Sequence, residues 1–425
     1  MPIKINHLIK RLYFLSLLLF LLPSFNLRLT YSYGIGKLLL CFITFLIVIL
    51  ILKKKITLNL NNKLALLFSL FFITQGLSII NAVDISLYVS RFKDLIFLSL
   101  FFFCSMYVFQ YRENNKKLII VLVIGLLFDL FSQVLMFFYP KIFIEIANNI
   151  LYPGDAQLIS LNIDRQRVYL GTYDEIMIPV IIYFHSLNKR KILLPLLPII
   201  VGISFLSQFR TKLLMAVFSF LSSLAILSKG VGKNNFIKVS ILPISLVIII
   251  LFSAYFLSSI TFGNSIINRL LLQNKIEDVL TVEQRISKSE EAISIGLSAP
   301  VFGVGLGNYN YYVTQRQIPR YNVSYQQIQI DLLHPHSLIP FIFAETGLPG
   351  LMAFILLVIY FITEDTKTIR YQKNNFTKAL IISFWTLFLY SLFNPTTNFS
   401  YNVLFWLLRV VIYYESVNRW THDRF

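Results

Sequence analysis

The chain has few charged residues for its length. Of its 425 residues, 14% are charged and 56% are hydrophobic, whereas a soluble domain carries about 25% charged residues. Many apolar runs approach or exceed the roughly 20 residues that a helix needs to cross a bilayer. A soluble enzyme is therefore excluded, and so is a β-barrel, whose strands are short and alternate in polarity. We predict an all-α polytopic membrane protein.

Cysteine is nearly absent as well. The two cysteines, Cys41 and Cys104, both lie in apolar runs, which argues against a disulfide framework and against a cysteine zinc site. The N-terminus has basic residues followed by Leu-rich sequence, as a signal peptide does, but no small-residue cleavage site follows. We expect this segment to be retained as the first membrane span.

About twelve apolar runs are suited to membrane helices. They lie at 8–26, 36–52, 64–80, 95–110, 118–138, 175–187, 192–207, 212–228, 239–260, 338–362, 379–393 and 403–415. This pattern divides the chain into three parts: nine spans in 1–260 with a smaller outer loop at 139–174, a large loop at 261–337 between spans nine and ten, and three spans in 338–425.

The net charge of +18 lies mostly in alternate loops. Lys53, Lys54 and Lys55 and the group Lys189, Arg190 and Lys191 are examples. The positive-inside rule assigns such loops to the cytoplasm, which predicts cytoplasmic termini and places the 139–174 and 261–337 loops outside. Because this distribution accounts for the basic charge, we expect membrane lipids as partners and no nucleic acid.

The longest polar segment with recognisable motifs runs from Arg285 to Leu351. It opens with a helical pattern to about Ala299 and continues with Gly303-Val-Gly305-Leu-Gly307. The glycines superficially resemble a nucleotide-binding loop, but no βαβ unit surrounds them and no Walker lysine follows. They predict a tight turn or a close approach of backbone to a ligand.

Two arginines are candidates for phosphate binding. Arg210 lies in Ser207-Gln-Phe-Arg210-Thr-Lys212 at an outer span boundary, and Arg285 shares a helix face with Lys288 and Ser289. A guanidinium group suits a phosphate better than an ammonium group does. The alternatives are a membrane anchor at Arg210 and a solvated amphipathic helix at Arg285.

His336 is the candidate general base. It follows Pro335 and precedes a span that starts on the outer side, with His334 and Glu345 nearby. Imidazole is matched to proton transfer near neutral pH, although a histidine in a loop can also serve only as a hydrogen-bonding group. Since no Cys or spaced His accompanies His334 and His336, we expect no metal.

The outer loop 139–174 offers a further candidate region. It carries Arg165 and Arg167, followed by Gly171-Thr-Tyr-Asp174. Tyr and Asp suit carbohydrate hydroxyl groups. These residues could therefore contact an acceptor or a sugar, or they could simply form an ordinary loop.

Together these motifs resemble the O-antigen ligase and O-antigen polymerase superfamily. The family pattern is Arg, a helix, Pro-x-x-Gly-x-Gly-x-Gly-x-Tyr, His-Asn-x-x-Leu and Glu-x-Gly-x-x-Gly-Leu, preceded by Ser-x-x-Arg at a span boundary. The matching residues are Arg210, Arg285, the stretch 300–309, His336 and the stretch 345–351. Two departures occur: Ser337 replaces the Asn, and Arg167 matches a further Arg-x-x-Gly-x-Phe element only loosely, without the following Pro-Asn.

The resemblance implies a metal-independent, inverting glycosyltransferase of the bacterial inner membrane, without cofactors. Its donor would be a glycan on a polyprenyl diphosphate, normally undecaprenyl diphosphate. The acceptor would be a glycan, a lipid A–core or a second lipid-linked glycan, as in polymerase or ligase reactions of O-antigen or capsule synthesis. In family terms Arg210 and Arg285 hold the diphosphate and His336 activates the acceptor hydroxyl. We add Arg167, His334 and Glu345 as candidate supporting residues, although His334 has no counterpart in the family pattern.

Two other functions fit the span pattern. A transporter or lipid-linked oligosaccharide flippase predicts ionisable residues or broken helices near the midplane, and the sequence shows mainly Asp129 and Arg409 inside spans. A scaffolding protein would leave the arginine and histidine motifs unexplained.

Overall fold

A computed structural model describes residues 2–21, 32–54, 63–111, 113–150, 173–186, 195–206, 210–227, 275–313, 337–371, 374–394 and 399–420. All regular structure within these ranges is helical, and they contain no strand. The prediction of an all-α protein is confirmed for this part of the chain.

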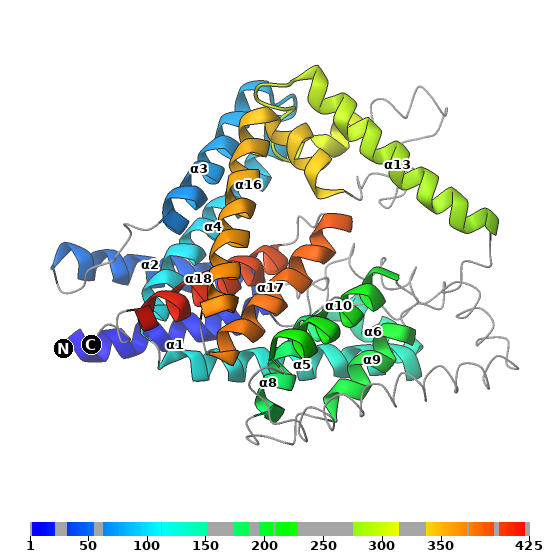
Figure 1. Ribbon diagram of the computed structural model, residues 1–425. Coiled ribbons are helices and arrows are strands. Elements are labelled where there is room, and N and C mark those ends of the chain that lie inside the picture. Colours follow the sequence, from blue (N-terminus) through cyan, green and yellow to red (C-terminus); the bar gives the residue numbers. More distant parts are fainter. Residues whose placement is uncertain are drawn as a thin grey trace, which may run out of the picture.

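The helices follow one another along the chain as Figure 1 labels them. They are α1 Pro2–Leu21, α2 Ser32–Leu52, α3 Lys63–Leu77, the 3-10 helix η1 Ser78–Asn81, α4 Ile85–Phe109, α5 Asn114–Phe138, α6 Pro140–Ile150, α8 Tyr173–Ser186, α9 Leu196–Leu206, α10 Arg210–Leu227, α13 Lys275–Ser298, α16 Leu338–Tyr371, α17 Asn375–Phe393 and α18 Phe399–Trp420.

Within the described ranges, six helices are long and apolar enough to cross a membrane. They cover Gly34–Leu52, Lys63–Asn81, Ile85–Phe109, Asn114–Met136, Leu338–Tyr371 and Asn375–Phe393. The helices α1, α8, α9, α10 and α18 coincide with five more predicted runs but are shorter or more polar. The predicted span 239–260 lies outside the described residues, so the total of about twelve stays a prediction.

The outward surface of α2 is apolar. Leu38, Phe45 and Leu52 are 72%, 60% and 76% exposed. In water such a surface would promote aggregation, whereas lipid chains solvate it without cost. The helix is therefore built to face hydrocarbon, as a multi-pass membrane protein requires.

Aromatic side chains fill the space between α3, α4, α17 and α18. The ring of Phe68 stacks on Phe102 at 4.0 Å between centroids and meets the edge of Trp406 at 4.7 Å. Figure 1 shows α3, α4 and α16 running side by side, with α13 projecting from their upper end and α5, α8, α9 and α10 forming a second group.

Several boundaries differ from the predicted ones, including the start of α4, which lies at Ile85 instead of about 95. The helix α13 begins at Lys275, ten residues before the predicted start, and the 139–174 loop contains the helix α6. Pro140 suits the first turn of α6 because a proline there forfeits no helical hydrogen bond. The helix α16 extends past the predicted limit of 362 to Tyr371, because Asp365 is buried beside Arg409, with paired bonds of 2.7 Å.

Segments that the charge pattern assigns to one side of the membrane also contact one another. On the predicted cytoplasmic side, Lys10 donates to Glu113, and Asn374 donates to Glu415 at 2.9 Å. The hydrogen bond from Lys10 lowers the pKa of Glu113. On the predicted outer side, the loop after α13 contacts the connection between α3 and α4, as described below. The fold and the charge pattern therefore agree on which loops share a side.

Candidate functional site

The helix α16 is interrupted close to its start. Gly347 has φ 67° and ψ −165°, which are not helical angles. Pro349 follows and has no N–H, so the carbonyl of Glu345 lacks the donor that a regular helix would supply four residues later. A buried carbonyl must find another donor. The loop 299–313, whose last five residues (309–313) form a short helical turn, provides it.

The loop 299–313 takes up the hydrogen bonds that α16 gives up at this bend. Three backbone bonds connect the two segments: Val304 N to Ala344 O at 2.8 Å, Gly305 N to Glu345 O at 3.1 Å, and Leu348 N to Pro300 O at 2.7 Å. The Gly-x-Gly-x-Gly and Glu-x-Gly-x-Pro motifs are therefore two halves of one backbone contact, which we call the glycine clamp (residues 299–309 and 344–350).

The glycines of the clamp have positive φ angles, which side-chain-bearing residues rarely adopt. The angles are 69° at Gly303, 96° at Gly305, 80° at Gly307 and 67° at Gly347. A Cβ atom at Gly303 would lie 2.3 Å from the carbonyl carbon of Glu345. The predicted tight turn is confirmed, and the close approach is to the protein's own backbone.

A second set of bonds ties the clamp to the start of α4. The Asn308 side chain, which is fully buried, accepts from Asp84 N at 2.8 Å and donates to Asp84 O at 3.2 Å. Leu306 N donates to Ser78 Oγ at 3.1 Å. Asp84 also caps α4 by accepting from the N–H groups of Ser86 and Leu87. Bonds from the Ser86 hydroxyl and the Leu87 N–H lower the pKa of Asp84.

Sequence reasoning missed the partners Ser78 and Asp84. The only available signal was local: Asp84 precedes an apolar run, as an N-cap residue does. Its contact with Asn308 spans 224 residues, and no spacing rule indicates a pairing over that distance.

Glu345, a predicted supporting residue, belongs to the clamp. Its side chain is buried, and Oε1 accepts from Gly307 N at 3.0 Å. Nearby, Tyr309 is also buried and meets the edge of Phe341 at 5.5 Å; burial raises the pKa of Tyr309. Glu345 therefore holds backbone in place in this structure.

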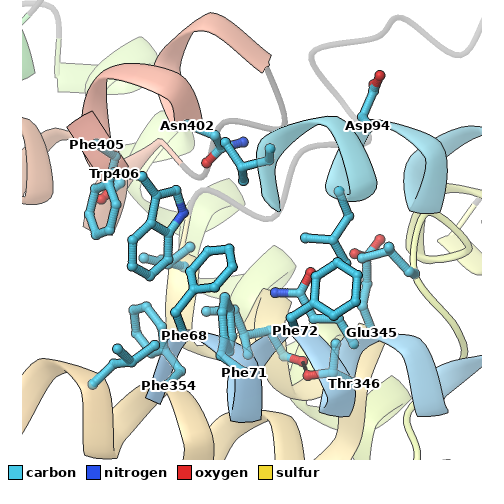
Figure 2. Close-up of a pocket in the computed structure, with 18 of the residues that line it drawn as sticks. Phe68, Phe71, Phe72, Asp94, Glu345, Thr346, Phe354, Asn402, Phe405 and Trp406 are labelled. Carbon is cyan, nitrogen blue, oxygen red and sulfur yellow. Dashed lines mark hydrogen bonds between the residues drawn. The ribbon is translucent and has the colours of Figure 1, made fainter. Parts of the chain in front are cut away.

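An apolar cavity of about 180 Å³ lies beside the clamp, between α3, α4, α16 and α18. Figure 2 shows Phe68, Phe405 and Trp406 on one side of it and Glu345 and Thr346 on another. Arg91 and Asp94 also line it, and Asp94 pairs with Lys37 at 2.6 Å. The cavity therefore combines a hydrocarbon-like wall with a polar, charged end.

The remaining predicted site residues are only partly described. Arg285 is exposed on α13, with its carbonyl accepting from Ser289 Oγ at 2.9 Å. Arg210 is the first residue of α10, but its side chain lies outside the described part. Arg167, His334 and His336 lie outside it altogether. The convergence of Arg210, Arg285 and His336 stays a prediction.

The position of His336 along the chain still relates it to the cavity. It precedes Leu338, which begins α16 and lines the cavity, by two residues. At the other end, α13 packs on α16 through Ala292 and Ile295, which share a small core with Tyr309 and Ala344. Arg285 and His336 thus belong to segments that both lead into the clamp.

Residues 195–355 match the model of a protein family described as O-antigen ligase. This segment is similar to an O-antigen ligase domain. It contains α9, α10, α13, the glycine clamp and the beginning of α16. The resemblance seen in the motifs is thereby confirmed, and it implies processing of lipid-linked glycans in the membrane. Among curated proteins, no match to the chain was found.

Proposed function

We propose that this protein transfers a glycan from a polyprenyl diphosphate to an acceptor hydroxyl at the outer face of the bacterial inner membrane, as an O-antigen polymerase or ligase. The observation that carries the proposal is the clamp. The family's own motifs build it, and it stands next to an apolar cavity at the start of α16.

The proposed reaction needs no metal and no nucleotide sugar. The acceptor oxygen bonds to the anomeric carbon while the bond from that carbon to the diphosphate oxygen breaks. The polyprenyl diphosphate leaves with the electron pair, and His336 takes the acceptor proton. Attack opposite the leaving group inverts the anomeric centre. Arg210 and Arg285 stabilise the charge that develops on the diphosphate.

The cavity fits one part of such a donor. Its wall of Phe68, Phe71, Phe72 and Trp406 suits an isoprenoid chain, and its volume of about 180 Å³ is smaller than the roughly 300 Å³ or more of a site for a whole small molecule. We expect a short stretch of the lipid to enter while the rest stays in the bilayer. The charged end, with Arg91, would lie toward the headgroup.

Purified protein in liposomes with a polyprenyl diphosphate-linked glycan and an acceptor tests the proposal. His336→Ala should lower turnover by about 10²–10⁴, and His334→Ala is the neighbouring control with a smaller expected effect. Wild-type activity should also fall as the pH drops through about 6.5, where a free imidazole protonates. Normal turnover by folded His336→Ala protein would remove the general base from the mechanism.

The arginines are tested by substitutions that keep their charge. Arg210→Lys and Arg285→Lys should each lose transition-state stabilisation of roughly 2–4 kcal/mol, because lysine cannot make the paired bonds of a guanidinium group. Arg370→Lys, at the exposed far end of α16, is the matched control. If all three variants turn over like the wild type, Arg210 and Arg285 are membrane anchors.

A buried group of ionisable residues favours a flippase or transporter as the second candidate. Asp129, Asp174, Glu175 and Lys212 are all fully buried in α5, α8 and α10, as a translocation path would predict. Translocation of a fluorescent lipid-linked oligosaccharide across liposomes, without an acceptor, would support this function. Glycan transfer that requires the acceptor supports the first.

A further inference from the structure

Lys212 is the centre of a buried polar cluster at the start of α10. Its ammonium group is fully buried and lies 2.9 Å from Asp174 Oδ2 and 3.5 Å from Glu175 Oε1. It also donates to Gln133 Oε1 at 2.7 Å. One lysine therefore links α10 to α8 and α5.

Three further bonds complete the cluster. Gln133 donates to Asp129 Oδ2 at 3.0 Å within α5, and Ser204 of α9 donates to Glu175 Oε1 at 2.6 Å. Ser219, two turns further along α10, donates to the backbone carbonyl of Glu175 at 3.0 Å. Four helices thus meet at fixed polar contacts, all of them buried.

Stability alone does not explain why this cluster consists of charged and polar side chains. Apolar side chains of similar volume would hold four helices at least as firmly, because burying charge costs solvation free energy. Within the described residues, Asp129, Asp174 and Glu175 each retain one oxygen without a hydrogen-bond partner. Hydrogen bonds and ion pairs require particular directions and distances, whereas apolar contacts allow helices to rotate and slide slightly. The cluster therefore fixes the rotation of each helix about its axis and its position along that axis.

Arg210 is the predicted site residue nearest to this cluster along the chain. It begins α10, and Lys212 lies in the same helical turn. We propose that Lys212, together with Asp174 and Glu175, is a positioning residue: it fixes the first turn of α10 so that Arg210 meets the donor diphosphate. The proposal rests on the donor-binding role of Arg210 given above. Among the described residues, no three His, Cys, Asp or Glu side chains are grouped so that they could hold a metal ion. The geometry therefore does not favour a cation site.

A charge-neutral pair substitution tests the proposal while limiting damage to the fold. Lys212→Met with Asp174→Asn removes one positive and one negative charge and keeps the side-chain sizes similar. We expect this protein to insert and melt close to the wild type, yet to show a KM for the lipid-linked donor raised by about 10- to 100-fold, because a small misplacement of a binding group has large effects. The KM for the acceptor should not change.

The matched control removes a buried ion pair elsewhere. Arg409→Met with Asp365→Asn deletes the pair between α18 and α16 and should leave the donor KM unchanged. If both pair variants change the donor KM equally, the effect of the Lys212 pair is general loosening of the fold, and the proposal is wrong.

A double-mutant cycle with Arg210→Lys separates this proposal from the function on which it rests. If Lys212 acts through Arg210, the two losses are not additive, because the second change removes a group that is already misplaced. Additive losses, or a wild-type donor KM in the pair variant, overturn the positioning role alone. If Arg210→Lys has wild-type activity, both the donor-binding role of Arg210 and the positioning role of Lys212 are wrong. Should the pair variant fail to insert, Glu175→Gln, which keeps size and the Ser204 contact, takes its place in the same cycle.

Discussion

A methyl group at Gly303 should open the glycine clamp. The φ angle there is 69°, and an added Cβ would lie 2.3 and 2.4 Å from the carbonyl carbon and oxygen of Glu345. These are backbone atoms of a helix bend, so neither can rotate away. The strain is relieved only if the loop 299–313 moves off α16.

The expected destabilisation comes from two sources. A left-handed conformation costs a residue with a side chain about 1–2 kcal/mol. Moving the loop away also breaks the bonds from Val304 to Ala344 and from Gly305 to Glu345, at about 0.5–1.5 kcal/mol each, or more where a buried carbonyl is left unpaired. We expect a loss of roughly 2–5 kcal/mol for Gly303→Ala, a large part of the roughly 5–15 kcal/mol that stabilises a typical domain.

The control is the same substitution at Gly202 in α9. No atom lies within 4 Å of a Cβ built there, and alanine favours a helix over glycine by up to about 1 kcal/mol. Thermal unfolding of both variants, followed by size-exclusion chromatography in detergent, should show a lower midpoint for Gly303→Ala and an unchanged or higher one for Gly202→Ala. Glycan transfer by Gly303→Ala should fall as well. Equal midpoints for the two variants would refute the clamp.

Three more predictions follow from the fold. Asp84→Ala removes the side-chain cap of α4 but keeps the backbone atoms that Asn308 contacts, and it should lower the thermal midpoint. Because the pKa of Asp84 is lowered in the folded state, the contribution of its carboxylate is present above the unfolded pKa of about 3.9 and is lost as pH falls through the folded value. Arg409→Leu alone should destabilise by about 3–5 kcal/mol, and adding Asp365→Leu should restore stability, as thermal midpoints would show. Reporter fusions should be extracytoplasmic at Asn308 and cytoplasmic after Phe425; a cytoplasmic signal at Asn308 would reverse the proposed orientation.

Local features of the fold were predictable from sequence where a local rule governs them. Apolar runs gave most helices, because a helix in lipid satisfies its own backbone hydrogen bonds. The glycines between 303 and 307 indicated unusual backbone angles, since only glycine adopts them without strain. The helical pattern after Arg285 was likewise confirmed by α13.

Features that depend on a distant partner were not predictable. The end of α16 was placed too early because Asp365 looks like a loop residue until Arg409, 44 residues away, is seen beside it. For the same reason Asp174 was taken as a candidate for carbohydrate contacts, and Glu175 and Lys212 were taken as the first residues of spans, whereas all three are buried and paired with one another. A charged residue inside a membrane helix becomes tolerable only through its partner, and hydropathy along the chain contains no information about partners.

The clamp and the proposed base should affect the reaction in different ways. The atoms nearest to a Cβ built at Gly303 or Gly347 are backbone atoms of the protein, so substitutions there change how much of the protein is correctly folded around the cavity. They should lower transfer without changing the shape of its pH profile. His336, if it takes the acceptor proton, sets that profile through its own protonation. We expect the pH–rate profile of Gly303→Ala to keep the wild-type midpoint and the profile of His336→Ala to lose it. That result would show that the glycines of the motif have a structural role and that the histidine transfers the proton. A shifted midpoint in Gly303→Ala would mean that the clamp also controls the environment of the base.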